Sequence, residues 1–255
     1  MTRVTMTVED GVADVRLARA EKLNALDAAM FADIAATIDR IGAMTDVRAV
    51  VLSGEGRGFC AGLDMAAMAG GGSGLLTAER THGPANLVQH VAWGWRALPQ
   101  PVVAALHGVA LGGGLQIASG ADIRIAHPET RLSVRELHWG IVPDMAGFAL
   151  WRSMVRDDHL REAIYTAREF AAVEAERLGF VTRLADDPLA EALALARTIA
   201  GRSPAAIRAA KRLAGAEGDA ATLLMAETEE QQRLLGTPEQ TEQVRANMEK
   251  RSARF

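Results

Sequence analysis

The fold of this chain is interpreted from residues 101–147, PVVAALHGVALGGGLQIASGADIRIAHPETRLSVRELHWGIVPDMAG. Residues 102–106 have the composition of a buried strand, and the glycine run 112–114 leads from there into a segment with helical character. Glycine lets a ligand approach the backbone closely, and a helix N-terminus offers free N–H donors. Two carboxylates, Glu136 and Asp144, follow in an otherwise apolar region. Together these features predict a site that stabilises an anion and moves protons.

Each feature also has a simpler interpretation. The glycine run is compatible with close packing of a helix on a strand, and Ile117 stands where a dinucleotide-binding motif has its last glycine. Glu136 could be a solvated loop carboxylate, and Asp144 could be a helix N-cap. A second glycine-containing loop, residues 59–64, could supply another N–H donor or be an ordinary connection between a strand and a helix.

Composition excludes several classes of protein. The 255 residues carry a formal net charge of −4, and the basic residues are scattered, which argues against a nucleic-acid binder. A single cysteine, Cys60, rules out an intramolecular disulfide; without a flanking base, it is predicted to be a small buried thiol. The six histidines are dispersed and match no zinc motif, so no metal is predicted. The alternating N-terminus and the lack of a long apolar run predict a cytoplasmic protein without a membrane span.

Periodicity predicts an α/β protein. Residues 4–8 and 12–17 alternate around an Asp10-Gly11 turn signal and predict a hairpin. Further strands are expected at 47–52, 102–106, 121–126 and 132–134, and helices at 28–41, 85–98 and 115–119, the first with Asp27 as N-cap and Gly42 as its end. From residue 146 onward the chain is expected to be almost wholly helical. Residues 70–74 are interpreted as a flexible surface loop, with a lid as the alternative.

Five sequence segments, in this order, make the chain resemble the crotonase superfamily of enoyl-CoA hydratases and isomerases over nearly its whole length. They are KLNAL (22–26), FCAGLDM (59–65), HGVALGGG (107–114), ADIR (121–124) and ELHWGIVP (136–143). The resemblance implies a crotonase-like ββα spiral core, residues 1–190, and a C-terminal helical trimerisation region, residues 191–255. It implies a homotrimer or a hexamer made of two trimers.

The resemblance also implies a site. The backbone N–H groups of Leu63 and Gly113 would form an oxyanion hole for the thioester oxygen of an acyl-CoA, which agrees with the two amide clusters inferred above. Coenzyme A would be part of the substrate, with no separate cofactor. The residues implied to bind CoA or substrate are Lys22, Leu23, Ala25, Ala61, Asp64, Met65, Gly112 and Pro143.

One departure from the family's hydratases concerns Gln116. Hydratases carry glutamates at the positions of Gln116 and Glu136, and an amide cannot exchange a proton at neutral pH. Some isomerases of the family use a single carboxylate at the Glu136 position, and dienoyl-CoA isomerases carry an aspartate at the position of Asp144. The hypothesis is therefore double-bond isomerisation of an enoyl-CoA, with Glu136 as proton shuttle and Asp144 as a second acid/base or an electrostatic modulator.

Two alternatives stay open from the sequence. One is an enoyl-CoA hydratase in which Gln116 positions the water and Glu136 does all the proton transfer. The other is a non-catalytic acyl-CoA binder that keeps the fold. A nucleic-acid partner would need a basic helical face, and no lysine-rich helix is present.

Overall fold

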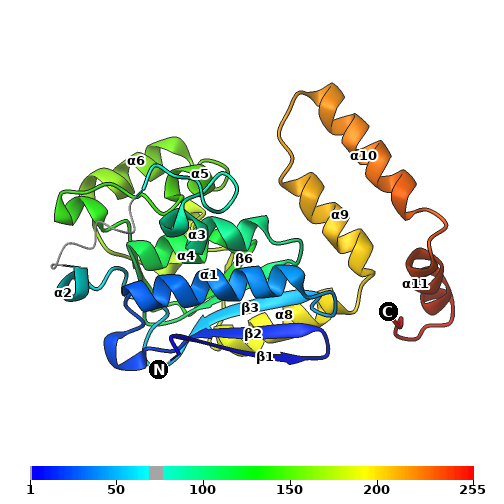
Figure 1. The fold of residues 1–255 in the computed structure, drawn as a ribbon, viewed down its shortest axis with the longest axis horizontal. Helices are drawn as coiled ribbons and strands as arrows, with labels where there is room; N and C mark the ends of the chain where they lie inside the picture. The colour runs from blue at the N-terminus through cyan, green and yellow to red at the C-terminus, as the bar shows by residue number, and fades with distance from the viewer. Residues whose placement is uncertain (1, 69–76) are drawn as a thin grey trace.

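The computed structural model describes residues 2–68 and 77–255 (Figure 1). The glycine-rich segment 70–74, interpreted from sequence as a surface loop or lid, lies outside these residues. Among the described helices, none combines the length and the apolar composition that crossing a membrane requires.

The largest sheet has six strands in the order β1-β2-β3-β4-β6-β9. They are β1 (Val4–Glu9), β2 (Val12–Leu17), β3 (Ala49–Gly54), β4 (Val102–Leu106), β6 (Ile123–Ala126) and β9 (Arg183–Leu184). The pair β1–β2 is antiparallel and all other pairs are parallel. Asp10 and Gly11 connect the first two strands with positive φ angles, so the predicted hairpin is confirmed.

The central strands are buried on both faces because helices cover both. Along β3, Val50 and Leu52 belong to one apolar core with α1 (Ala28–Ala43) and α3 (Leu87–Ala97). Their neighbours Ala49 and Val51 belong to a second core with α8 (Pro188–Ala200). Successive strand residues point to opposite faces, which accounts for this division. Figure 1 shows α1 and α8 on opposite sides of the strands.

The ends of the helices mostly follow their capping residues. Asp27 accepts a hydrogen bond from the N–H of Met30 at 2.8 Å, as an N-cap does, which confirms the predicted start of α1. The prediction that Gly42 ends this helix is wrong, because α1 continues to Ala43. The remaining short helices of the core are the 3-10 segment η1 (Ala20–Lys22), α2 (Met65–Met68), α4 (Gly113–Gly120), the 3-10 segment η3 (Glu136–Trp139), α5 (Gly147–Trp151), α6 (Asp157–Thr166) and α7 (Ala172–Leu178).

A second, three-stranded sheet has the order β5-β7-β8, formed by β5 (Val109–Leu111), β7 (Arg131–Ser133) and β8 (Phe170–Ala171). After residue 146 the described elements are helices, as expected, apart from the two short strands β8 and β9. Each has only two residues, too few to show an alternating pattern. These strands form because an earlier strand of the sheet offers unpaired backbone groups beside them.

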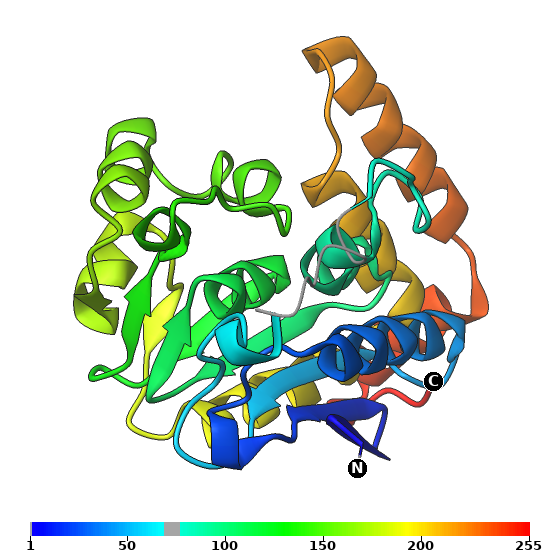
Figure 2. The ribbon, with the colours of Figure 1, turned by 60° about the vertical axis from the view of Figure 1, so that its left-hand side comes forward.

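Three helices at the C-terminal end extend away from the sheets: α9 (Pro204–Ala214), α10 (Ala220–Leu234) and α11 (Pro238–Met248). Figures 1 and 2 show α10 standing clear of the main body. Lys211 attaches α9 to the core through contacts of 2.8 Å with the carboxylate of Asp122 and with the carbonyl oxygen of Gln100. Large apolar side chains of this region are exposed, namely Leu224, Met225, Leu235, Val244 and Met248.

Candidate active site

The two glycine-containing loops singled out in the sequence lie side by side. Cys60 forms an isolated parallel bridge with Ala110 of β5, and its carbonyl oxygen accepts the N–H of Leu111 at 3.0 Å. A Cβ atom at Gly114 would lie 2.3 Å from that oxygen, so this close approach requires glycine. The glycine run thus packs tightly, and the packing brings two amide segments together. The Cys60 thiol is buried, and desolvation raises its pKa to about 12, which makes it a poor nucleophile.

The backbone N–H groups of Leu63 and Gly113 are among those in these segments that have no hydrogen-bond acceptor in the described residues. Gly113 is the first residue of α4, where an N–H has no partner inside the helix. Gly62 precedes Leu63 with φ +86°, and a Cβ atom there would lie 3.5 Å from the Gly113 nitrogen. The two donors therefore occupy neighbouring parts of the structure.

A cavity of about 110 Å³ adjoins both donors. It is lined by Ala61, Gly62, Leu63, Met65, Gly112, Gly113, Arg135, Glu136, Trp139 and Ile141. The segment after β7 thus meets the two glycine-containing loops at one place. Glycine and apolar residues make up most of this lining, and Arg135 and Glu136 are its two charged residues. A largely apolar lining strengthens the electrostatic effect of an N–H donor on a bound oxygen.

Glu136 begins η3 and is only 7% exposed. Its Oε1 accepts a hydrogen bond from Nε2 of Gln116 at 2.6 Å, whereas its Oε2 is buried and has no hydrogen-bond partner among the described residues. Desolvation raises the pKa of Glu136, and the charge of Asp144 raises it further. One oxygen is therefore held in place by Gln116, while the other has no protein partner and keeps its lone pairs for a proton.

Gln116 is fully buried in α4, and its amide has three protein partners. Besides donating to Glu136, it accepts hydrogen bonds through Oε1 from the N–H groups of Met145 and Gly147, at 2.9 and 3.0 Å. The amide therefore connects the carboxylate to the loop that leads into α5. This arrangement fixes the orientation of the amide and, through it, that of Glu136.

Asp144 lies half-buried in the same loop, and desolvation raises its pKa. It is not among the residues that line the cavity. The interpretation of Asp144 as a helix N-cap is wrong, because α5 begins at Gly147 with Ala146 as its N-cap residue. Asp144 is thus close enough to Glu136 for its charge to raise the pKa of that carboxyl group.

The residues implied to bind CoA or substrate are distributed unevenly. Ala61, Met65 and Gly112 line the cavity. The others do not: Lys22 is exposed, Leu23 is half-exposed, Ala25 and Pro143 are buried, and Asp64 pairs with Arg19 at 2.8 Å. A role for these five in binding the rest of a long ligand outside the cavity stays a prediction.

Sequence reasoning missed the importance of Asn24. Its buried side chain accepts the N–H of Arg19 at 2.8 Å and donates to the carbonyl oxygens of Glu55, Gly58 and Phe59 at 2.9–3.1 Å. It therefore holds residues 55–59, which connect β3 to the cavity loop. The only sequence signal was an asparagine inside an otherwise apolar connector, in the segment KLNAL.

A buried carboxyl group and two N–H groups without an acceptor therefore belong to residues that line one small cavity, an arrangement suited to stabilising an oxyanion during proton transfer. The model of the family "Enoyl-CoA hydratase/isomerase" matches residues 7–255 of this sequence. The chain belongs to the enoyl-CoA hydratase/isomerase family, the crotonase superfamily to which its motifs had pointed.

Individual relatives include both activities of the family. YngF of Bacillus subtilis (strain 168), itself assigned provisionally as an enoyl-CoA hydratase/isomerase, is 34% identical over 244 residues, which cover 94% of this chain and 92% of YngF. The mitochondrial Δ(3,5)-Δ(2,4)-dienoyl-CoA isomerase of Rattus norvegicus is 33% identical over 218 residues, or 78% of this chain and 64% of that protein. The crystal structure of an enoyl-CoA hydratase from Bacillus anthracis superposes with a TM-score of 0.87 at 27% identity, covering 99% of this chain and 98% of the other. The predicted fold class is confirmed.

Proposed function

We propose that this protein shifts the double bond of an enoyl-CoA thioester, with Glu136 carrying the proton. The observation that supports this most directly is that Glu136, whose buried Oε2 has no hydrogen-bond partner among the described residues, lines the same cavity as Leu63 and Gly113, whose N–H groups have no acceptor there. A single buried carboxylate beside an oxyanion hole is sufficient for a proton to leave one carbon and arrive at another.

The reaction begins with a 3-enoyl-CoA whose thioester oxygen accepts hydrogen bonds from Leu63 and Gly113. Glu136 removes a proton from C2, and the electron pair of that C–H bond forms a dienolate whose charge rests largely on the thioester oxygen. The two N–H groups stabilise this charge more strongly than the neutral carbonyl. Protonation of C4 by the same carboxyl group then gives the 2-enoyl-CoA and restores the Glu136 carboxylate.

The hydrogen bonds of Gln116 support isomerisation over hydration. Adding water to a double bond requires one group that activates the water and one that manages the proton at C2. The Gln116 oxygen already accepts two N–H groups and its nitrogen donates to Glu136, so the amide is committed to positioning the carboxylate. Hydration by Glu136 alone, with Gln116 positioning the water, is the second candidate.

The burial and the raised pKa of Asp144 support a variant of the same proposal. Its half-buried carboxyl group, with a raised pKa, affects Glu136 electrostatically and could take part when a conjugated 3,5-dienoyl substrate has to be protonated at a more distant carbon. We therefore include 3,5-dienoyl-CoA thioesters in the proposed substrate class. Similarity to the rat dienoyl-CoA isomerase supports the same extension.

The decisive experiment supplies 3-enoyl-CoA, 2-enoyl-CoA and 3,5-dienoyl-CoA thioesters separately and follows the products by mass and by chromatography. We expect the 3-enoyl substrate to isomerise without a change of mass. A gain of the mass of water from the 2-enoyl substrate, together with no isomerisation of the 3-enoyl one, would replace the proposal by hydratase activity. Tight binding of every thioester without any turnover would point to the non-catalytic acyl-CoA binder.

We further propose that the exposed apolar side chains of α10 and α11 form contacts between copies of this chain in a trimer or hexamer, in the cytoplasm. Isolated helices with exposed leucine and methionine are stabilised when another surface covers them. Sedimentation equilibrium measures the state directly, and a monomer at micromolar concentration would contradict this assignment.

A further inference from the structure

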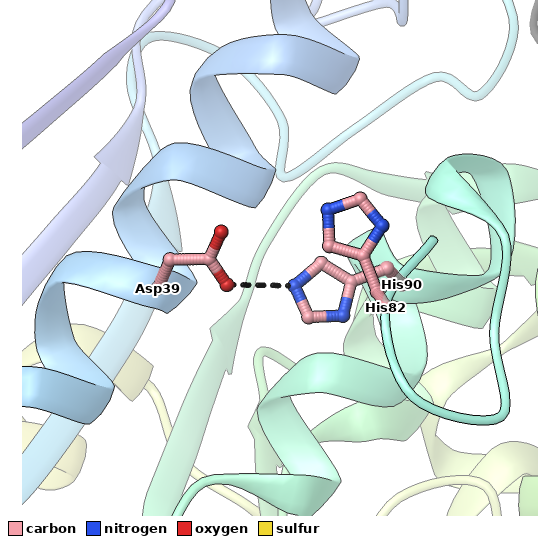
Figure 3. A group of neighbouring side chains, drawn as sticks. All are labelled: Asp39, His82 and His90. Atoms are coloured by element: carbon pink, nitrogen blue, oxygen red, sulfur yellow. Dashed lines mark ion pairs between the residues drawn. The ribbon is translucent and has the colours of Figure 1, made fainter. Parts of the chain in front are cut away.

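Two histidines and one aspartate meet on the side of the molecule formed by α1 and α3 (Figure 3). Asp39 lies in the penultimate turn of α1, His90 lies in the first turns of α3, and His82 lies on the turn that precedes α3. One nitrogen of each ring and one carboxylate oxygen lie within 4.8 Å of one another. Among the described residues no other group of three potential metal ligands comes this close.

The His90 ring is held in place between two helices. It is 9% exposed, and a Cβ atom at Gly94 would lie 2.8 Å from the ring and 2.9 Å from Ile38 of α1, so the missing side chain leaves the space that the ring fills. Its Nε2 lies 3.3 Å from Oδ1 of Asp39, but it makes no well-aligned hydrogen bond within the described chain. A buried polar nitrogen of this kind is costly unless something binds it.

His82 offers its ring from a defined turn. The backbone groups of His82 and Ala85 form two reciprocal hydrogen bonds of 3.0 and 3.1 Å, which close the turn through Gly83 and Pro84. The ring stacks on His90 with 4.2 Å between centroids, and its Nδ1 lies 2.8 Å from Oγ1 of Thr81. When Nδ1–H donates to this hydroxyl, Nε2 keeps its lone pair and is free to bind a metal. Figure 3 shows a nitrogen of each ring on the side that faces Asp39.

We propose that Asp39, His82 and His90 bind a divalent first-row transition metal ion, of which Zn²⁺ is the probe of choice. Imidazole nitrogen together with one carboxylate suits zinc, nickel, copper or cobalt, whereas magnesium and calcium prefer oxygen ligands alone. Three protein ligands leave the fourth position of a tetrahedral ion to water. Nothing in this inference depends on the proposed isomerase activity.

The geometry needs only a modest adjustment. Bonds of about 2.0–2.1 Å to zinc place tetrahedral ligand atoms roughly 3.3 Å apart, so the outermost atoms would move inward by about 1.5 Å. Asp39, whose side chain is 62% exposed, and the turn that carries His82 can supply this movement, and the exposed carboxylate also leaves a path for the ion. Burial and the neighbouring His82 lower the pKa of His90, which favours the neutral ring, the form that binds metals.

Binding would fasten the turn at residues 82–85 to α1. Two elements that are far apart in sequence, residue 39 and residues 82–90, would then share one cross-link. Because a ligand that binds only the folded state stabilises it, the melting temperature should rise with zinc concentration. The amide hydrogens of the turn should also exchange more slowly in the presence of the ion.

The test uses the full chain without an affinity tag, stripped of metal by a chelator and titrated with zinc chloride by calorimetry at pH 7.5. We expect one ion per chain, and a weakening of at least tenfold for each of His82→Ala and Asp39→Asn. His159→Ala, which removes an equally accessible histidine beside an aspartate on α6, is the matched control and should bind as the parent does. Both altered positions are partly exposed, so these variants should keep the fold, which circular dichroism verifies.

Hydrogen exchange provides a second measurement on the parent chain. Zinc should slow exchange in peptides that contain residues 82–90, and the Asp39→Asn variant should lose this protection. Equal zinc affinity in the parent and in a variant with both Asp39→Asn and His82→Ala would overturn the proposal. A preference for Mg²⁺ over Zn²⁺ would overturn the assigned class of metal.

Discussion

Replacing Glu136 by glutamine tests the proposed proton carrier without changing the shape of the side chain. Oε1 of the new amide can still accept the hydrogen bond from Gln116, while the group at Oε2 can no longer exchange a proton at neutral pH. Loss of a general acid/base costs roughly 10²- to 10⁴-fold in turnover. We therefore expect kcat for 3-enoyl-CoA to fall by about 10² or more, equivalent to about 2.7 kcal/mol of transition-state stabilisation.

The same substitution should make the folded protein more stable above the ordinary carboxyl pKa of 4.5. Burial raises the pKa of Glu136, so the folded state binds its proton more tightly than the unfolded chain does. The stabilising contribution is complete below pH 4.5 and is lost as the pH rises through the raised pKa. At pH 8 the parent thus carries a buried charge with one unpaired oxygen, a cost of about 1–3 kcal/mol.

The two effects are measured side by side. Turnover is followed by chromatography of the CoA thioesters, and thermal unfolding is recorded from pH 5 to pH 8 at one protein concentration. A gain of about 1 kcal/mol raises the melting temperature of a chain of this size by roughly 2–4 °C. We expect this gain at pH 8 and a smaller one at pH 5. Turnover retained in Glu136→Gln would show that Glu136 does not carry the proton. Glu129→Gln, at an exposed carboxylate, is the control for both measurements.

Three further substitutions address the surroundings of the site. Asp144→Asn removes a negative charge that raises the pKa of Glu136, so the rise of kcat with pH should shift to lower pH. A drop of about 10²-fold in kcat at every pH would instead identify Asp144 as a proton carrier. Asn24→Ala leaves several buried backbone groups without partners and should lower the free energy of unfolding by about 1–3 kcal/mol, measured by urea denaturation; an unchanged midpoint would contradict this. Gly112→Ala places a Cβ atom 3.3 Å from Oε1 of Glu136, on a residue whose φ is +50°. We expect the free energy of unfolding to fall by about 1–3 kcal/mol and turnover to fall as well. If both stay at the parental values, the substitution does not strain the backbone.

Local sequence patterns predicted much of the chain. The alternation of residues 4–8 and 12–17 and the apolar composition of residues 102–106 were sufficient to predict strands, because strands of five or six residues carry a recognisable pattern. Ordered motifs identified the family, and they singled out Glu136, Gln116 and both glycine-containing loops. The two-residue strands β8 and β9 were not predicted, because they form by pairing with strands distant in sequence and not through their own composition.

What the sequence by itself determined was the family, the succession of elements and the identity of the groups that can exchange a proton or donate a hydrogen bond. These depend on residue type and on short-range spacing. Tertiary structure alone decided which of these groups have partners: it occupied the Gln116 amide with three partners, left one oxygen of Glu136 unpaired, and half-buried Asp144. It also brought Asp39 to two histidines that are dispersed in the sequence. Burial and hydrogen bonding arise from contacts between distant residues, and no local pattern encodes them.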